Sequence, residues 1–202
     1  KAVKVNLSMK RAHFLENVSR SLGNKTLPSH GEKPSQQNSP TTADLQTIIQ
    51  QFIHEANAVK AQTHLVADEA SAMKKIVQLL NNQSNNKYIS WDDNWLPVTN
   101  LETHLASANY ERYQSKVPRD TAERIRAHTK LAEVSVGITG CSAALADTGS
   151  IVLESQSGQG RLSSLLPPVH IALLTTDQIY PTMESYIKSQ PEAGYRSSNL
   201  IV

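Results

Sequence analysis

The sequence is poor in cysteine and lacks long apolar runs. Among its 202 residues the single cysteine is Cys141, which rules out a disulfide within the chain and a zinc or iron–sulfur site built from its own cysteines. This cysteine usage suits a reducing cytosol, although a secreted protein without disulfides would have the same composition. No run approaches the roughly 18 apolar residues of a membrane-spanning helix, and no charged-plus-apolar leader stands out. We therefore predict a cytoplasmic protein with no membrane span.

Neither sign of charge dominates. Twenty Lys and Arg residues and 18 Asp and Glu residues give a net charge of +2, and both signs are mixed along the chain. Because nucleic-acid binders usually cluster their basic residues, this balance argues against such a partner. An apolar fraction of 39% is typical of a globular protein, and the length predicts one domain, or one domain with an appendage.

The hydrophobic pattern divides the chain into three parts. A narrow apolar stripe predicts a helical arm over residues 1–23, capped by Ser8 and ended by Gly23. Residues 24–41 hold three prolines among small polar side chains, which is the composition of a flexible linker, so we expect the arm to dock on the main body or on a neighbouring subunit. The main domain would span residues 42–202. Because the sequence stops inside the apolar run NLIV, we expect the C-terminal end of this domain to be incomplete.

Helix and strand patterns alternate within the main domain. Apolar side chains at helical spacing predict helices over residues 42–56, 68–80 and 179–187, and a more polar helical region over 100–132 that is broken at Pro118. Short apolar runs predict strands over residues 63–67, 87–90, 134–138, 150–154 and 169–176, and at NLIV. The last three internal runs are rich in β-branched residues without clean alternation, as expected of strands buried on both faces. The alternation predicts an α/β fold with a largely parallel sheet.

The segment VGITGCSAALADTGSIVLESQSGQGR, residues 136–161, holds five of the eight glycines. We expect residues 137–140 to turn the chain after a strand, residues 142–146 to form a short helix, and residues 147–149 to turn back into the next strand. Ligands of open α/β sheets bind at the carboxyl ends of strands, where such turns lie, and free amides at a helix start suit an anion. The alternative is that glycine only supplies positive φ in tight connections.

This segment closely resembles the LUD-domain family, and within it the lactate-utilisation protein C type. The strings GITGCSAALADTGSIVLES and GQGRLSSLLPPVHIALL carry the resemblance, and the N-terminal RAHFLENVSRSLG is similar to the opening helix of that family. The resemblance implies a three-layer α/β/α fold related to the sugar-phosphate isomerase and CoA-transferase architecture. It also implies a role in cytoplasmic oxidation of L-lactate to pyruvate beside two iron–sulfur partner proteins, with no cofactor in this chain.

Two departures from the family pattern stand out. The family often has alanine or another small residue where Cys141 stands. Family members also continue past the strand that matches NLIV into a Gly-Pro-Ser segment with a downstream Asp and Glu, and then a His-Gly-Pro turn. This sequence contains neither, so a site that uses them would be incomplete here.

The glycine-rich turns predict one ligand pocket at the carboxyl edge of the sheet. Glycine would let the backbone approach the ligand, and threonine hydroxyls with free amides would hold the oxygens of a small acid. An arginine would add the charge, and an aspartate would orient a hydroxyl or that arginine. The expected ligand-binding residues are Thr139, Gly140, Asp147, Thr148, Gly149, Arg161 and His170.

Several of these side chains also have purely structural explanations. Asp147 could close an Asx-type turn, Arg161 could be a solvated residue at a helix start, and His170 could be held by backbone hydrogen bonds. Glu154 could mimic the catalytic glutamate of CoA transferases, although a surface acid at a strand end is the more usual explanation. Cys141 lacks a neighbouring base in sequence, and the histidines show no metal-ligand spacing, so we predict no metal site.

The last feature is the pair Trp91 and Trp95 around two aspartates. It could form a sugar-stacking patch, or it could anchor a loop to the core. For the whole chain, the alternative to a lactate-oxidising subunit is a free-standing enzyme or sensor for a small anionic metabolite, such as a sugar phosphate, a CoA ester or a carboxylate.

Overall fold

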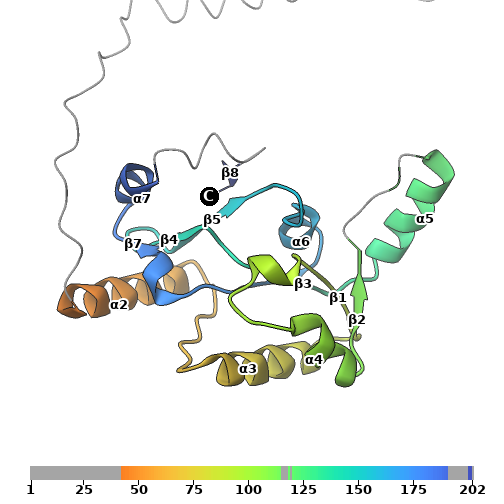
Figure 1. Ribbon diagram of the computed structural model, residues 1–202, viewed down its shortest axis with the longest axis horizontal. Helices are drawn as coiled ribbons and strands as arrows, with labels where there is room; N and C mark the ends of the chain where they lie inside the picture. The colour runs from red at the N-terminus through yellow and green to blue at the C-terminus, as the bar shows by residue number, and fades with distance from the viewer. Residues whose placement is uncertain (1–41, 115–117, 119, 191–199, 202) are drawn as a thin grey trace, which may run out of the picture. The chain divides into compact units, whose positions relative to one another are not determined.

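The computed structural model describes residues 42–114, 118, 120–190 and 200–201 (Figure 1). The predicted arm, residues 1–23, and the linker, residues 24–41, lie outside the described residues. The helices are α2 (Thr42–Ala58), α3 (Glu69–Asn81), α4 (Leu101–Ser107), α5 (Thr121–Leu131), α6 (Leu162–Leu165) and α7 (Met183–Ser189). The strands are β1 (Lys87–Ser90), β2 (Glu111–Tyr113), β3 (Val136–Thr139), β4 (Ala143–Leu145), β5 (Ser150–Glu154), β6 (Val169–Ala172), β7 (Ile179–Tyr180) and β8 (Leu200–Ile201).

The first sheet contains four strands in the order β2-β1-β3-β6, and all of them run parallel. Helices α3 and α4 cover one face, where Ile76 and Leu101 pack on Val136 and Ile138 in one buried cluster. Helix α6 lies on the other face, so close to β3 that a Cβ on Gly137 would lie 2.8 Å from the carbonyl carbon of Ser163. The predicted three-layer α/β/α arrangement with a parallel sheet is therefore confirmed (Figure 1).

The second sheet has the order β7-β4-β5-β8 and mixes parallel and antiparallel pairs. Side chains of β4 alternate between its two faces, as a period of two requires. Ala144 packs with Phe52 of α2, whereas Leu145 packs with Tyr186 of α7. This sheet therefore also lies between helices.

The prediction of a short helix at residues 142–146 is wrong. Residues 143–145 form β4 instead, which makes a hairpin with β5 and runs parallel to β7. Alanine favours helix in isolation, but Ala143 and Ala144 are fully buried between two strands, and pairing overrides the local preference. The backbone therefore leaves the first sheet after Thr139 and enters the second sheet at Ala143.

Other boundaries also differ from the sequence pattern. Residues 63–67 form no strand, because Leu65 and Val66 are exposed and find no pairing partner among the described strands. The region 100–132 holds a strand, β2, between α4 and α5. Ile179 belongs to β7 rather than to the closing helix, and β6 is only half-buried rather than buried on both faces.

Helix α5 differs from the other helices in how little of it is buried. Asp120 caps its first turn by accepting hydrogen bonds from the amides of Ala122 and Glu123. Leu131 is buried at its last turn, whereas Ile125 is 62% exposed.

Within the described ranges, no helix is both long and apolar enough to cross a bilayer.

Candidate functional site

Two cavities lie near the glycine-rich segment. The first, which we call the His170 cavity, has a volume of about 370 Å³ and is lined by residues of the β4–β5 hairpin, α6 and β6. The second, which we call the Trp95 cavity, has a volume of about 360 Å³ and lies where several strands of the first sheet end. No described residue lines both cavities.

The His170 cavity contains three of the predicted site residues, Thr148, Gly149 and His170. Thr139 belongs to the same group, because its Oγ1 is hydrogen-bonded to His170 Nε2 at 2.8 Å. Thr139 is the fully buried last residue of β3, and β3 is paired in register with β6. The structure therefore brings together four of the predicted residues from three separate segments of the chain.

The His170 cavity has no charged side chain in its lining among the described residues. Burial lowers the pKa of His170 from its ordinary value of 6.5, so the imidazole is neutral at physiological pH. A neutral imidazole has one N–H donor and one acceptor nitrogen. With the hydroxyls of Thr148 and Ser150 in the lining, it can hold the oxygens of a small ligand without an ion pair.

Gly149 has a structural reason to be glycine. Its φ is +67°, and an added Cβ would lie 2.6 Å from the Cα of Ala56 in α2. The left-handed backbone and the close approach to a helix each make any residue other than glycine costly at this position. The tight-turn explanation is thus sufficient for Gly149, and its position beside a cavity is an additional property.

The remaining predicted residues do not join this group. Gly140 lines the Trp95 cavity, where a Cβ would clash with the Trp95 carbonyl. Asp147 and Arg161 are exposed and line neither cavity, and Arg161 takes part in no salt bridge among the described residues. The expected single pocket is thus divided, because β4 moves the second turn from the first sheet to the second.

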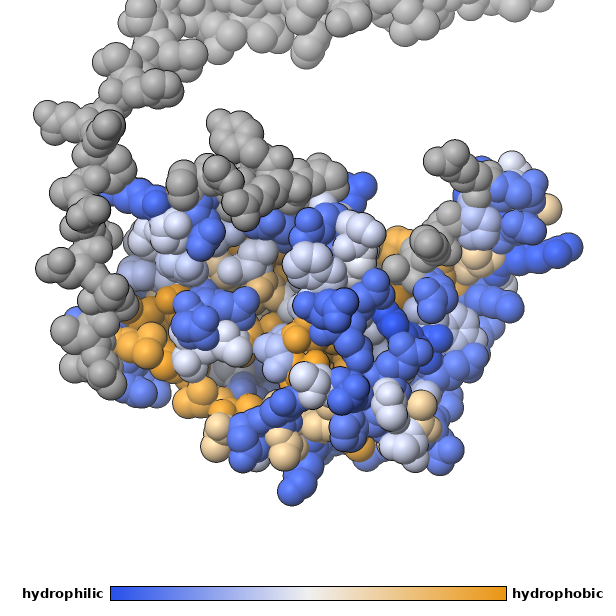
Figure 2. Space-filling model, in the orientation of Figure 1, coloured by the Kyte–Doolittle hydropathy of each residue, from blue (hydrophilic) through white to orange (hydrophobic). Residues whose placement is uncertain are grey.

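On the face shown in Figure 2, apolar residues gather over α2 and the segment that follows it. The largest exposed apolar side chains of that segment are Val59 and Leu65. Val59 also lines the His170 cavity, as does Leu165 of α6, which is 66% exposed. The exposed residues of the lining thus include apolar side chains, whereas hydroxyls and an imidazole contribute its polar groups.

The Trp95 cavity contains residues that sequence reasoning did not connect. Gln178 donates from Nε2 to the Cys141 carbonyl at 2.7 Å and accepts from the Thr175 amide at 2.9 Å, so its side chain ties two loops together. Glu154 and Gln159 also line this cavity. Gln159 and Gln178 belong to no sequence motif, so the sequence did not indicate them. For Glu154, the position at the end of a predicted strand was the signal that could have indicated a role in this cavity.

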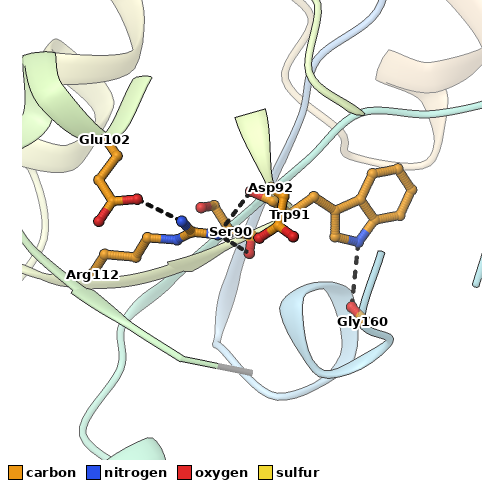
Figure 3. Close-up of polar contacts among 6 residues, drawn as sticks. All are labelled: Ser90, Trp91, Asp92, Glu102, Arg112 and Gly160. Atoms are coloured by element: carbon orange, nitrogen blue, oxygen red, sulfur yellow. Dashed lines mark hydrogen bonds and ion pairs between the residues drawn. The ribbon is translucent and has the colours of Figure 1, made fainter. Parts of the chain in front are cut away.

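A polar network surrounds the C-terminal end of β1 (Figure 3). Arg112 donates from Nη1 to Glu102 at 2.6 Å and from Nη2 to Asp92 at 2.9 Å, and it also reaches the Trp91 carbonyl at 3.2 Å. Burial alone would lower the pKa of Arg112, but the hydrogen bonds to Glu102 and Asp92 raise it above its ordinary value. The arginine therefore remains charged and joins Glu102 of α4 to Asp92, which follows β1.

The two tryptophans have different roles. Trp91 is 3% exposed and donates from Nε1 to the Gly160 carbonyl at 3.3 Å, so it anchors its loop to the core (Figure 3). Trp95 is 43% exposed and lines the cavity.

Cys141 also lines the Trp95 cavity, but it is poorly suited to act as a nucleophile. Burial raises the pKa of its thiol to about 12, so the reactive thiolate is scarce at neutral pH. Within the described part of the chain, no three His, Cys, Asp or Glu side chains come together as potential metal ligands.

Comparisons with known proteins place these features in context. The family model for the LUD domain matches residues 49–200. The chain is 28% identical over 207 residues to "Lactate utilization protein C" of Geobacillus sp. (strain WCH70), a match that covers 92% of this chain and 80% of that protein. It is 42% identical over 57 residues to "Lactate utilization protein B" of Bacillus subtilis, which covers 28% of this chain and only 12% of that longer protein.

One solved structure is also similar, that of a DUF162 family protein from Deinococcus radiodurans. The TM-score is 0.56 at 21% identity, and the match covers 81% of this chain and 88% of that chain. At this identity the likeness establishes the fold.

Proposed function

Because the chain belongs to the LUD domain family, as its glycine-rich segment predicted, we propose that it is a non-cluster component of a cytoplasmic system that oxidises L-lactate to pyruvate. The observation that carries the proposal is the match to lactate utilization protein C, which spans most of both chains. The shorter matches to lactate utilization protein B fit a system of several proteins, in which two iron–sulfur proteins would be the partners.

In this proposal the partners carry the redox centres. The chain has one cysteine, and that cysteine is buried with a raised thiol pKa, so it offers no set of thiolates for a cluster. The contribution of this chain would be to bind a small carboxylate and to present it to, or sense it for, the partner proteins.

The His170 cavity is the site that we propose for the carboxylate. The hydroxyls of Thr148 and Ser150 and the neutral His170 can donate to carboxylate oxygens. Thr139 Oγ1 is hydrogen-bonded to His170 Nε2 at 2.8 Å, which limits the orientation of the imidazole ring. Arg161 is exposed and lies at the start of α6, the helix that contributes Ser164 and Leu165 to the cavity lining. Its positive charge would attract the incoming anion.

A deletion strain with plasmid-borne variants tests both the function and the site. We expect deletion to abolish growth on L-lactate and the wild-type gene to restore it. Thr139→Val keeps the β-branched shape but removes the hydroxyl that bonds His170, so it should restore growth poorly. Thr129→Val is the matched control, because that hydroxyl donates to the backbone carbonyl of Ile125 within α5.

Co-purification separates the alternatives. A tagged chain should retain both iron–sulfur proteins from lactate-grown cells. Normal growth of the deletion strain together with no association would contradict the proposal. The free-standing enzyme or sensor would then be favoured if L-lactate, a sugar phosphate or a CoA ester stabilised the isolated chain, by about 2.7 kcal/mol at 100 times its Kd.

A further inference from the structure

The Trp95 cavity lies at the place where α/β proteins usually bind small molecules. Its lining includes Trp95 after β1, Cys141 after β3 and Leu173 after β6. These three strands are adjacent and parallel, so their carboxyl ends open into one crevice. A volume of about 360 Å³ is within the range of small-molecule sites. The proposed lactate function does not use this cavity.

The charge in this cavity excludes anions. Among the described residues Glu154 is the one charged side chain in the lining, and no lysine, arginine or histidine faces it there. Glu154 accepts a hydrogen bond from the Tyr186 hydroxyl through Oε1 at 2.9 Å. Burial, and then the contact with Glu154, raise the pKa of Tyr186, so the phenol remains a donor. The second carboxylate oxygen has no hydrogen-bond partner among the described residues and is available to a donor from a ligand.

Gln159 supplies a second acceptor. It is 6% exposed, and its Oε1 is buried without a hydrogen-bond partner in the described residues. Its backbone is fixed, since its amide donates to the Gln156 carbonyl at 3.0 Å and its carbonyl accepts from Ser155 Oγ at 3.2 Å. Buried polar atoms in folded proteins nearly always have a partner, so this oxygen indicates a missing donor.

The other groups provide an apolar wall and shape. Trp95, Leu96, Pro97 and Leu173 line the cavity on its apolar side. The Gln178 amide is held by the Cys141 carbonyl and the Thr175 amide, so it shapes the cavity. The ligand that fits best donates hydrogen bonds to Glu154 and Gln159, carries no negative charge, and offers C–H surface to the wall.

We propose that the Trp95 cavity binds a neutral polyhydroxylated molecule of about monosaccharide size. Its hydroxyls donate to Glu154 and to Gln159, and its C–H face packs against Trp95 and the neighbouring aliphatic side chains. Hydroxyls fit both acceptors without a countercharge, which a sugar phosphate or a carboxylate would need against Glu154.

Tryptophan fluorescence of the full chain, with saturation-transfer NMR as a second readout, tests this proposal. The probes are D-glucose, D-ribose and myo-inositol, with L-lactate and inorganic phosphate for comparison. We expect at least one neutral polyol to give a saturable signal in both measurements, and Trp95→Phe to remove most of the fluorescence change. Trp91 should contribute little to the change because it is buried.

Variants at the two acceptors locate the binding. Gln159→Leu removes the unpartnered oxygen at similar size, and Glu154→Gln keeps an acceptor for Tyr186 while it removes the charge. Each should weaken polyol binding about tenfold, the worth of one hydrogen bond to a fixed acceptor. Glu111→Gln, on an exposed position of β2, is the matched control and should bind as the wild type does.

Three results would overturn the proposal. One is the absence of a saturable signal with all three polyols in both readouts. Another is tighter binding of L-lactate or phosphate than of any polyol at this cavity. The third is unchanged polyol affinity in Gln159→Leu and Glu154→Gln variants whose circular dichroism shows the wild-type fold.

Discussion

Replacing Gly149 with alanine should destabilise the protein more than the same change at Gly158. Both glycines have a positive φ, +67° and +82°, so each alanine pays the cost of a left-handed backbone, about 1–2 kcal/mol. At Gly158 the new Cβ would meet side-chain atoms, 2.8 Å from Trp95 Nε1 and 3.0 Å from Asp92 Oδ2, and these side chains can move more easily than backbone. At Gly149 it would meet the backbone of α2, 2.6 Å from Ala56 Cα, which cannot move without the helix.

The difference between the two variants isolates the backbone clash. Forcing extra volume into a packed site costs about 1–3 kcal/mol. We therefore expect Gly158→Ala to lower the free energy of unfolding by about 1–2 kcal/mol and Gly149→Ala by about 2–5 kcal/mol. Urea unfolding followed by far-UV circular dichroism measures both against the wild type.

Two outcomes would refute this reasoning. Equal losses, within about 0.5 kcal/mol, would show that α2 yields freely to the new methyl group. A Gly149→Ala variant of wild-type stability that fails to restore growth on L-lactate would show instead that this glycine serves the ligand. The comparison thus separates packing from binding at a position where the sequence left both open.

Three further predictions concern other parts of the structure. Burial lowers the pKa of His170, so between that pKa and 6.5 the unfolded chain binds more protons than the folded chain. The free energy of unfolding should therefore fall as the pH drops through 6.5. His170→Gln should remove most of this fall in urea unfolding measured over a series of pH values. Leu105→Ala empties a fully buried position and should cost about 2–5 kcal/mol in urea unfolding, whereas Ile125→Ala, at a 62% exposed position, should stay within about 0.5 kcal/mol. Arg112→Met removes the cation that bonds Asp92 and Glu102 and should lower the melting temperature in a thermal melt; an unchanged melting temperature would contradict the role of Arg112 in joining these two side chains.

The sequence predicted best those elements whose pattern is set by burial on one side. Helix α2 follows from its apolar stripe, and Ile49 and Phe52 of that stripe are buried as expected. Asp68 caps α3 by accepting from the Ser71 amide at 2.7 Å, as the aspartate before an apolar face indicated. Strands β1 and β5 occupy the predicted residues 87–90 and 150–154.

The failures share one cause, which is tertiary pairing that no local pattern encodes. The alanines of β4 form a strand because β5 and β7 lie on either side of it. Strand β4 also explains why the predicted site residues are divided between two cavities. It places Thr148 and Gly149 at the His170 cavity, whereas Gly140 stays at the Trp95 cavity. Spacing along the chain could not show that two turns nine residues apart end at different sheets.

The sparse burial of α5 has a consequence for how the protein opens. Isolated helices shorter than about 12–15 residues are marginal in water, and α5 spans 11 residues with Leu131 as its buried anchor. Its amide protons should therefore exchange with solvent through local unfolding, at a free energy far below that of β3, whose four residues are all buried. Among the described helices, proteases that need an extended substrate should cut α5 first, while the two sheets stay intact.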